Sequence, residues 1–309
     1  MRDVLLFARK TARDGARPKL LVVFLIPYLA VGTLILMLLT AGQDPLADLP
    51  VIAQEQALLD DYSQLAFAWL VTFPMVFIAV LAARSVAGEH ERGTLRVLLS
   101  KPVRRTEVLV GQFLAITAVG WMVMVAGLLV GAVVLVQLTE PSGSAIQGGI
   151  FVLIPGTVVY ALVVAAVTAA VGTLVGVVTR SRLQTAVLTS LLPVVFFAFV
   201  LARQLLPADL YKQYYLYVLD VNYHLGILFV LVHDLVGFGL DPSTAEAIET
   251  VSGAFDTAGM WEDPLLDGFV GSMPLAGHVP PVVSVLGVVV VGIAALAVAT
   301  RRFERMDVG

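Results

Sequence analysis

Six long stretches of this 309-residue chain contain no Asp, Glu, Lys or Arg. They cover residues 20–43, 62–83, 108–139, 141–179, 183–202 and 268–300. Each contains an apolar run of about 20 residues, the length with which a helix crosses the roughly 30 Å apolar core of a bilayer. Strands of a membrane barrel alternate apolar and polar residues, whereas these runs are apolar at nearly every position. They therefore predict an all-α, polytopic membrane protein with six transmembrane helices.

The composition fits this class and excludes several others. Hydrophobic residues make up 59% and charged residues 14% of the chain, against roughly 45–50% and about 25% in a soluble domain. The absence of cysteine excludes disulfides, cysteine-ligated metals and a thiol nucleophile. The net charge of −4 gives no basic field for nucleic acid, so the surroundings expected for this chain are a lipid bilayer.

The distribution of Lys and Arg predicts the topology. The helices are placed at residues 20–40, 64–83, 108–136, 150–179, 185–202 and 281–300. One side of the membrane then holds 17 of the 19 basic residues, and the other holds 16 of the 23 acidic ones. Because Lys and Arg concentrate on the cytosolic side, we expect a plasma-membrane protein with both termini in the cytosol.

This topology divides the chain into segments. They are a cytosolic amphipathic segment (1–19), a membrane domain with helices one to five (20–202) that includes a cytosolic loop (84–107), an acidic extracellular loop (203–280), helix six (281–300) and a cytosolic tail (301–309). Residues 3–13 have two open interpretations, an amphipathic helix on the inner membrane surface or a disordered basic tail.

One further apolar segment, 225–240, lies inside the extracellular loop. It is short for a span and contains His233 and Asp234. An Asp near the middle of a membrane helix costs about 2.5–3.5 kcal/mol, and a seventh crossing would move the C-terminal arginines outside. We therefore predict a re-entrant or interfacial helix rather than a span.

The predicted spans contain no charged side chain and no His. Ion-coupled transporters usually keep such groups at mid-membrane, so this absence disfavours a secondary transporter. Two pairs of glycines four residues apart, Gly127 with Gly131 and Gly172 with Gly176, predict close helix packing. The packing is either within the chain or along a dimer seam.

The cytosolic loop 84–107 has its own pattern. Leu95, Leu98 and Leu99 share one helical face at i, i+3 and i+4 spacing, and Pro102 ends the helix. Such a short amphipathic helix between two spans can transmit a push from a cytosolic partner. The alternative is a basic loop whose leucines only enter the membrane interface.

The same loop resembles that of ABC-2 type permeases. The family pattern is E-x-x-x-G-T-L-x-x-L-L-S-x-P-[VI]-x-R followed by G-K-[FL], and here Val103 and Gly111 match it, with Gln112 in place of the more usual Lys. The resemblance implies that the loop docks on a separate ATPase. The residues to which it assigns this coupling role are Glu89, Arg92, Gly93, Thr94, Leu95, Leu98, Leu99, Ser100, Pro102 and Arg105.

The resemblance also implies an architecture and partners. It predicts an ABC-2 (type V-like) half-transporter, similar in layout to the NosY-like permeases, that forms a homodimer or a heterodimer with a similar permease. The chain has no G-x-x-x-x-G-K-[ST] motif, which a nucleotide site of that kind requires. We therefore expect no catalytic residue and no cofactor on this chain, with ATP and Mg on the partner ATPase.

Export is the direction expected from the family. Two alternatives remain, a membrane assembly or maturation factor that acts through loop 203–280, and an ion-coupled secondary transporter. His224, His233, Asp234 and His278 lie in that loop, but they do not form a local pattern such as H-E-x-x-H, so no metal site is expected.

Overall fold

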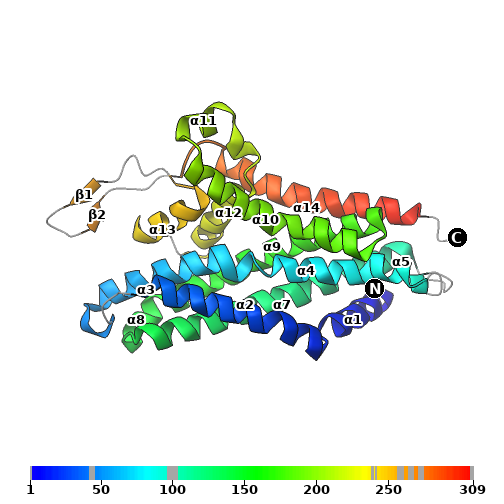
Figure 1. The fold of residues 1–309 in the computed structure, drawn as a ribbon, viewed down its shortest axis with the longest axis horizontal. Coiled ribbons are helices and arrows are strands. Elements are labelled where there is room, and N and C mark those ends of the chain that lie inside the picture. The colour runs from blue at the N-terminus through cyan, green and yellow to red at the C-terminus, as the bar shows by residue number, and fades with distance from the viewer. Residues whose placement is uncertain are drawn as a thin grey trace.

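The computed structural model describes residues 2–41, 46–95, 104–237, 240, 242–255, 261–263, 268–270 and 275–306. Long helices run side by side along the longest axis of the molecule (Figure 1). Six are long and apolar enough to cross a membrane, namely Pro18–Leu39, Val51–Glu91, Arg105–Thr139, Gly143–Thr179, Arg182–Leu205 and Pro281–Glu304. The prediction of an all-α protein with six spans is confirmed.

The second span differs from its predicted bounds. It was expected to begin at residue 64, but the helical segment begins at Val51. It consists of α3 (Val51–Leu65), the π-helical η2 (Ala66–Val71), α4 (Met75–Ala82), the π-helical η3 (Ala83–Ala87) and α5 (Gly88–Glu91). A charge-free stretch marks the apolar part of a helix, whereas α3 continues beyond it through residues that carry Asp60 and Asp61.

Two helices form the centre of the bundle. They are α7 (Arg105–Thr139) and α9 (Ile150–Thr179), which pack on each other and on most other long helices. Around them lie α1 (Arg2–Gly15), α2 (Pro18–Leu39), α8 (Gly143–Gly148), α10 (Arg182–Leu205) and α14 (Pro281–Glu304). A short 3-10 turn, η1 (Leu46–Asp48), precedes α3.

The paired glycines face other helices of the same chain. A Cβ at Gly127 would lie 1.9 Å from the hydroxyl of Tyr28 on α2, and one at Gly131 would lie 2.7 Å from Leu70. A Cβ at Gly172 would meet Ala82 at 2.7 Å, and one at Gly176 would meet Thr185 at 3.6 Å. The first three glycines therefore let side chains of neighbouring helices lie against the helix backbone, which a larger residue would prevent.

The segment between α10 and α14 folds mainly into short helices. They are α11 (Ala208–Gln213), η4 (Leu216–Val218), α12 (Val221–Leu235) and α13 (Pro242–Ser252). A small antiparallel hairpin, β1 (Trp261–Asp263) with β2 (Gly268–Val270), follows and pairs Trp261 with Val270. The sequence pattern did not indicate this hairpin.

Helix α12 overlaps the apolar segment predicted at 225–240, but it begins four residues earlier and ends at Leu235. It has 15 residues, fewer than the six spans, and it is buried against α9, α10 and α14. The ring of Phe229 lies 5.6 Å from that of Phe67 and 5.1 Å from that of Tyr160. This helix is therefore part of the protein core.

Arg203 joins the end of α10 to these short helices. Its guanidinium pairs with Asp220 at 2.5 Å, donates to the side chain of Asn222 at 2.8 Å and donates to the carbonyl of Val251. The Asp220 carboxylate is fully buried, and it also accepts a hydrogen bond from Tyr211. A buried charge pair of this kind fixes the positions of the elements that supply it.

The N- and C-terminal ends of the chain lie at the same end of the bundle (Figure 1). Residues 2–15 form the helix α1, not a disordered tail, and α1 packs along α7. A Cβ at Gly111 would lie 2.7 Å from the carbonyl oxygen of Val4 and 2.9 Å from Phe7. The backbone of Val4 and the side chain of Phe7 thus lie against α7, while Leu5 is 69% exposed.

Candidate functional site

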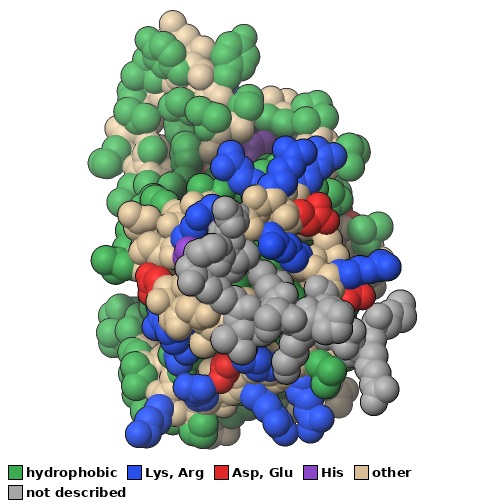
Figure 2. All heavy atoms as spheres, turned by 90° about the vertical axis from the view of Figure 1, so that its right-hand side faces the viewer, with side chains coloured by type: hydrophobic (Ala, Val, Ile, Leu, Met, Phe, Trp, Pro, Cys, Tyr) green, Lys and Arg blue, Asp and Glu red, His purple; other side chains and the backbone are tan. Residues whose placement is uncertain are grey.

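The end of the bundle that carries both termini is rich in Lys and Arg side chains, with few acidic ones (Figure 2). We call it the basic end. The described residues that supply its charge include Lys10, Arg13, Arg84, Arg92, Arg104, Arg105, Arg180, Arg182, Arg301 and Arg302. They come from α1, from the end of the second span and from the ends of α7, α9, α10 and α14, so the folded chain gathers distant basic segments on one face.

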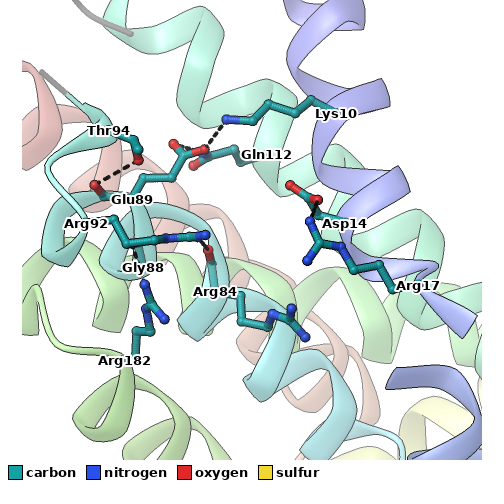
Figure 3. Close-up of polar contacts among 10 residues, drawn as sticks. All are labelled: Lys10, Asp14, Arg17, Arg84, Gly88, Glu89, Arg92, Thr94, Gln112 and Arg182. Carbon is teal, nitrogen blue, oxygen red and sulfur yellow. Dashed lines mark hydrogen bonds and ion pairs between the residues drawn. The ribbon is translucent and has the colours of Figure 1, made fainter. Parts of the chain in front are cut away.

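Glu89 is a buried carboxylate at the basic end that contacts two other helices. Its side chain is 8% exposed, and its Oε1 lies 2.6 Å from Nζ of Lys10. The amide nitrogen of Gln112 donates to Oε2 at 2.9 Å, as Figure 3 shows. A carboxylate buried to this extent requires charged or donor partners. Glu89 therefore connects three elements, α1 through Lys10, α5 through itself and α7 through Gln112.

A cavity of about 200 Å³ adjoins this contact. Its walls come from α1, α4, η3, α5 and α7. Arg84, Glu89 and Arg92 form its polar side, and Leu81 and Ile116 its apolar side. Within η3 the backbone of Ser85 leaves the helical region, with ψ at −109°. The second span therefore bends beside the residues that hold α1.

A tight turn follows α5. The carbonyl of Gly88 accepts from Nε of Arg92 at 2.9 Å, and the hydroxyl of Thr94 donates to the carbonyl of Glu89 at 3.2 Å. Gly93 has φ of +68°, which favours glycine, and nothing lies within 4 Å of where its Cβ would be. Residues 91–94 are exposed, so this turn projects from the basic end. We call residues 91–94 the exposed turn.

The exposed turn is also tied to α10. The backbone N–H of Arg182 donates to Oε1 of Glu91 at 2.7 Å, and the two side chains form an ion pair at 3.1 Å. The guanidinium of Arg182 donates in addition to the carbonyl of Gly88 at 3.0 Å. These contacts hold the start of α10 against α5.

Leu95 and Arg105 have different surroundings from the exposed turn. Leu95 is 1% exposed and belongs to a buried cluster with Leu109 and Phe303. Arg105 donates to the carbonyls of Met306 at 2.5 Å and Glu304 at 3.1 Å. Leu95 thus anchors the turn inside the protein, and Arg105 holds the end of α14 against the start of α7.

The predicted coupling residues therefore divide into groups. Glu89 and Leu95 are buried anchors, and Arg92, Gly93 and Thr94 form the exposed turn. Four predicted coupling residues lie outside the described residues, namely Leu98, Leu99, Ser100 and Pro102.

Sequence reasoning missed three partners of this site. Lys10 and Gln112 hold Glu89, and Arg182 holds Gly88. Lys10 and Arg182 lie on segments far from the loop, whereas Gln112 follows it closely. A signal was present for Gln112, because a polar side chain near the start of an apolar helix needs a partner inside the protein.

Among the described residues, no three His, Asp or Glu side chains lie close enough together to hold a metal ion. His233 is fully buried, and its Nδ1 donates to the carbonyl of Phe229 at 2.7 Å. The ring of His278 stacks on that of Tyr217 with centroids 3.8 Å apart. These histidines have packing and hydrogen-bonding partners of their own.

Comparison with known proteins agrees with this geometry. Residues 8–308 match the profile of the family described as ABC-2 family transporter protein. The chain is also similar to the probable ABC transporter permease protein NosY of Stutzerimonas stutzeri, with 34% identity over 116 residues. That alignment covers 37% of this chain and 38% of the relative, so it spans less than two fifths of either protein.

Proposed function

This chain belongs to the ABC-2 transporter family as a membrane permease subunit, and we propose that a separate ATPase subunit drives it to export a substrate. The ATPase binds ATP and Mg²⁺, and the permease provides the path through the membrane. Two permease chains, identical or similar, work with two ATPase subunits.

One observation carries the proposal. No atom lies within 4 Å of the Cβ position of Gly93, so the exposed turn is open at this residue. The turn is fixed on both sides by the buried residues Glu89 and Leu95. These anchors contact α1, α7 and α14. A force applied to the turn from outside therefore reaches three long helices at once, as coupling to an ATPase requires.

The charge of the basic end supports the orientation. Lys and Arg concentrate on the cytosolic side of membrane proteins, and ATP is bound there. We place the basic end and both termini in the cytosol of a plasma-membrane protein, with α11, α12 and α13 toward the exterior. When the ATPase pair closes on ATP, it moves the exposed turns of both permeases.

Co-purification tests this proposal. Gly93→Asp adds a charged side chain to the exposed turn, in a left-handed conformation that Asp tolerates, and meets no neighbour. We expect roughly tenfold less ATPase to stay bound, with an unchanged melting temperature. Gly143→Asp is the matched control, because Gly143 also has open space around its Cβ position but lies at the start of α8.

Equal ATPase binding by wild type and Gly93→Asp would contradict the docking role of the turn. Transport in vesicles that lack ATP but carry an ion gradient would instead favour a secondary transporter. Absence of ATP-driven transport, together with loss of a maturation activity in variants of loop 203–280, would favour an assembly factor.

A further inference from the structure

The cavity of about 200 Å³ at the basic end has two unlike sides. Leu81, Ile116 and Val119 form its apolar side, and they lie in charge-free stretches of the chain. Lys10 and Arg84 on the other side belong to the basic end. The cavity therefore lies where the apolar part of the bundle meets its charged end. In a membrane protein such a boundary lies at the depth of the lipid head groups.

Positive charge exceeds negative charge in this cavity. The described residues of its wall supply three cations and two carboxylates, namely Lys10, Arg84, Arg92, Asp14 and Glu89. Asp14 pairs with Arg17, which does not line the cavity. Glu89 pairs with Lys10. Both carboxylates therefore have other partners, and neither neutralises Arg84.

Arg84 is the cation of this wall whose charge has no partner among the described residues. Its guanidinium makes no hydrogen bond or ion pair within the described part of the chain, and no dashed line reaches it in Figure 3. By contrast, Nε of Arg92 donates to the carbonyl of Gly88. Arg84 is partly exposed, so its N–H groups are accessible, and an arginine side chain stays charged in proteins. The wall thus holds a fixed, accessible positive charge that attracts an anion.

Phosphate is the anion that suits this cavity best. A guanidinium can donate two parallel hydrogen bonds to phosphate oxygens. The volume lies below the roughly 300–1,000 Å³ of typical small-molecule sites, so the cavity admits a small phosphate group and excludes a bulky ligand. The apolar side next to the charge favours an amphiphilic molecule over a free ion, and basic pockets between membrane helices bind anionic lipid head groups.

Helix α1 gives a second reason to expect lipid at this place. It forms one wall of the cavity, and it exposes Leu5 by 69% and Leu6 by 58%. Exposed apolar side chains on a helix that also exposes Arg9 and Arg13 are typical of helices in the membrane interface. Lipid head groups are therefore the anions nearest to this cavity.

We propose that this cavity binds the phosphate of an anionic glycerophospholipid, with Arg84 as its counter-ion. Two N–H groups of Arg84 donate to phosphate oxygens. The ammonium of Lys10, which uses one donor for Glu89, supplies a further contact. The acyl chains lie outside the cavity, in the bilayer. Arg84 is not one of the predicted coupling residues and the site needs no ATPase, so it does not depend on the proposed coupling.

Native mass spectrometry of the permease alone, as the full chain in detergent, tests the site. The protein is titrated with dioleoyl phosphatidylglycerol or with dioleoyl phosphatidylcholine, which share the phosphodiester and the acyl chains but differ in net charge. Arg84→Gln removes the unpaired charge from the cavity wall. Arg13→Gln is the matched control, because it removes one charge at an exposed position of α1 that does not line the cavity.

We expect wild type to bind the first phosphatidylglycerol roughly tenfold more tightly than phosphatidylcholine. Arg84→Gln should lose this preference, and Arg13→Gln should keep it. Arg84→Lys keeps the charge but not the paired donors, so it should keep part of the preference. Without lipid, Arg84→Gln should melt at the wild-type temperature, because the guanidinium has no partner in the described part of the chain.

A wild-type preference in Arg84→Gln, or an equal loss in Arg84→Gln and Arg13→Gln, would overturn the site. A lower melting temperature of lipid-free Arg84→Gln would contradict the unpaired guanidinium on which the site depends. Inorganic phosphate and glycerol 3-phosphate, each added as a competitor, distinguish the source of the anion. We expect neither to displace phosphatidylglycerol at equal concentration, and displacement would overturn the assignment to a lipid.

Discussion

Lys10 and Glu89 are 79 positions apart in the sequence, and their side chains meet at 2.6 Å. This pair attaches the N-terminal helix to the last turn of the second span, next to the exposed turn. Because Glu89 also accepts from Gln112 of α7, Glu89 holds the N-terminal helix and α7 together beside the exposed turn.

The two partners of this pair should differ in their effect on stability. Glu89→Ala removes the acceptor of the buried Gln112 amide, and we expect it to lower the free energy of unfolding by about 1–3 kcal/mol. Lys10→Ala removes a half-exposed side chain and should cost about 1 kcal/mol or less. Chemical denaturation in detergent measures both, and a larger loss for Lys10→Ala would contradict the central role of Glu89.

The contact of α1 with α7 depends on Gly111. A Cβ there would lie 2.7 Å from the backbone oxygen of Val4, and a backbone atom does not move without its helix. Gly111→Ala should therefore displace α1 and increase trypsin cleavage at Arg9 and Lys10. Gly143→Ala is the control, since its Cβ position is open. Unchanged cleavage in Gly111→Ala would show that α1 is not seated on α7.

Arg203 should be essential for the fold of the segment between α10 and α14. Arg203→Ala leaves the buried carboxylate of Asp220 without its counter-charge, which typically costs about 3–5 kcal/mol. We expect a lower melting temperature and faster hydrogen exchange in α12 and α13. Adding Asp220→Asn should recover part of the loss. If the double variant is as unstable as the sum of both single changes, the pair is not coupled.

Stability should depend on pH through His233. Burial lowers the pKa of His233 below its ordinary 6.5, while hydrogen bonds to the carbonyls of Phe229 and Leu153 oppose the shift. The folded protein thus keeps the ring neutral, and the unfolded chain takes up a proton near pH 6.5. Stability from this residue is present above that pH and falls as the pH drops below it, toward the lowered pKa.

Thermal unfolding between about pH 7.5 and pH 5 measures this dependence. In His233→Gln the fall in stability toward acid should be smaller than in wild type. An identical pH profile in both proteins would show that another group is responsible. The imidazole ring of His233 also packs directly against Gly156, where a Cβ would clash with the ring.

The sequence predicted the spans because lipid excludes charge, a rule that depends on each segment alone. The same rule placed the start of the second span too late, since α3 carries Asp60 and Asp61 and is still helical. It predicted a helix near residues 225–240 that does not span, which stays a prediction, and it did not indicate that Phe229 packs against Phe67 inside the bundle.

The candidate site was predictable only in part. The motif drew attention to Glu89, Gly93 and Leu95, but it did not distinguish the buried anchors from the exposed turn. That difference arises from Lys10 and Phe303, which lie near opposite ends of the chain. Contacts over such distances depend on the packing of several helices and leave no local pattern in the sequence.

The most direct test of the proposed mechanism is photocrosslinking from two exposed positions at opposite ends. A photoreactive amino acid replaces Thr94 in the exposed turn or, in a separate variant, Tyr215, which is 76% exposed. In intact cells that also produce the ATPase, we predict a permease–ATPase crosslink from position 94 and no such crosslink from position 215. A crosslink to the ATPase from position 215, with none from position 94, would contradict the account.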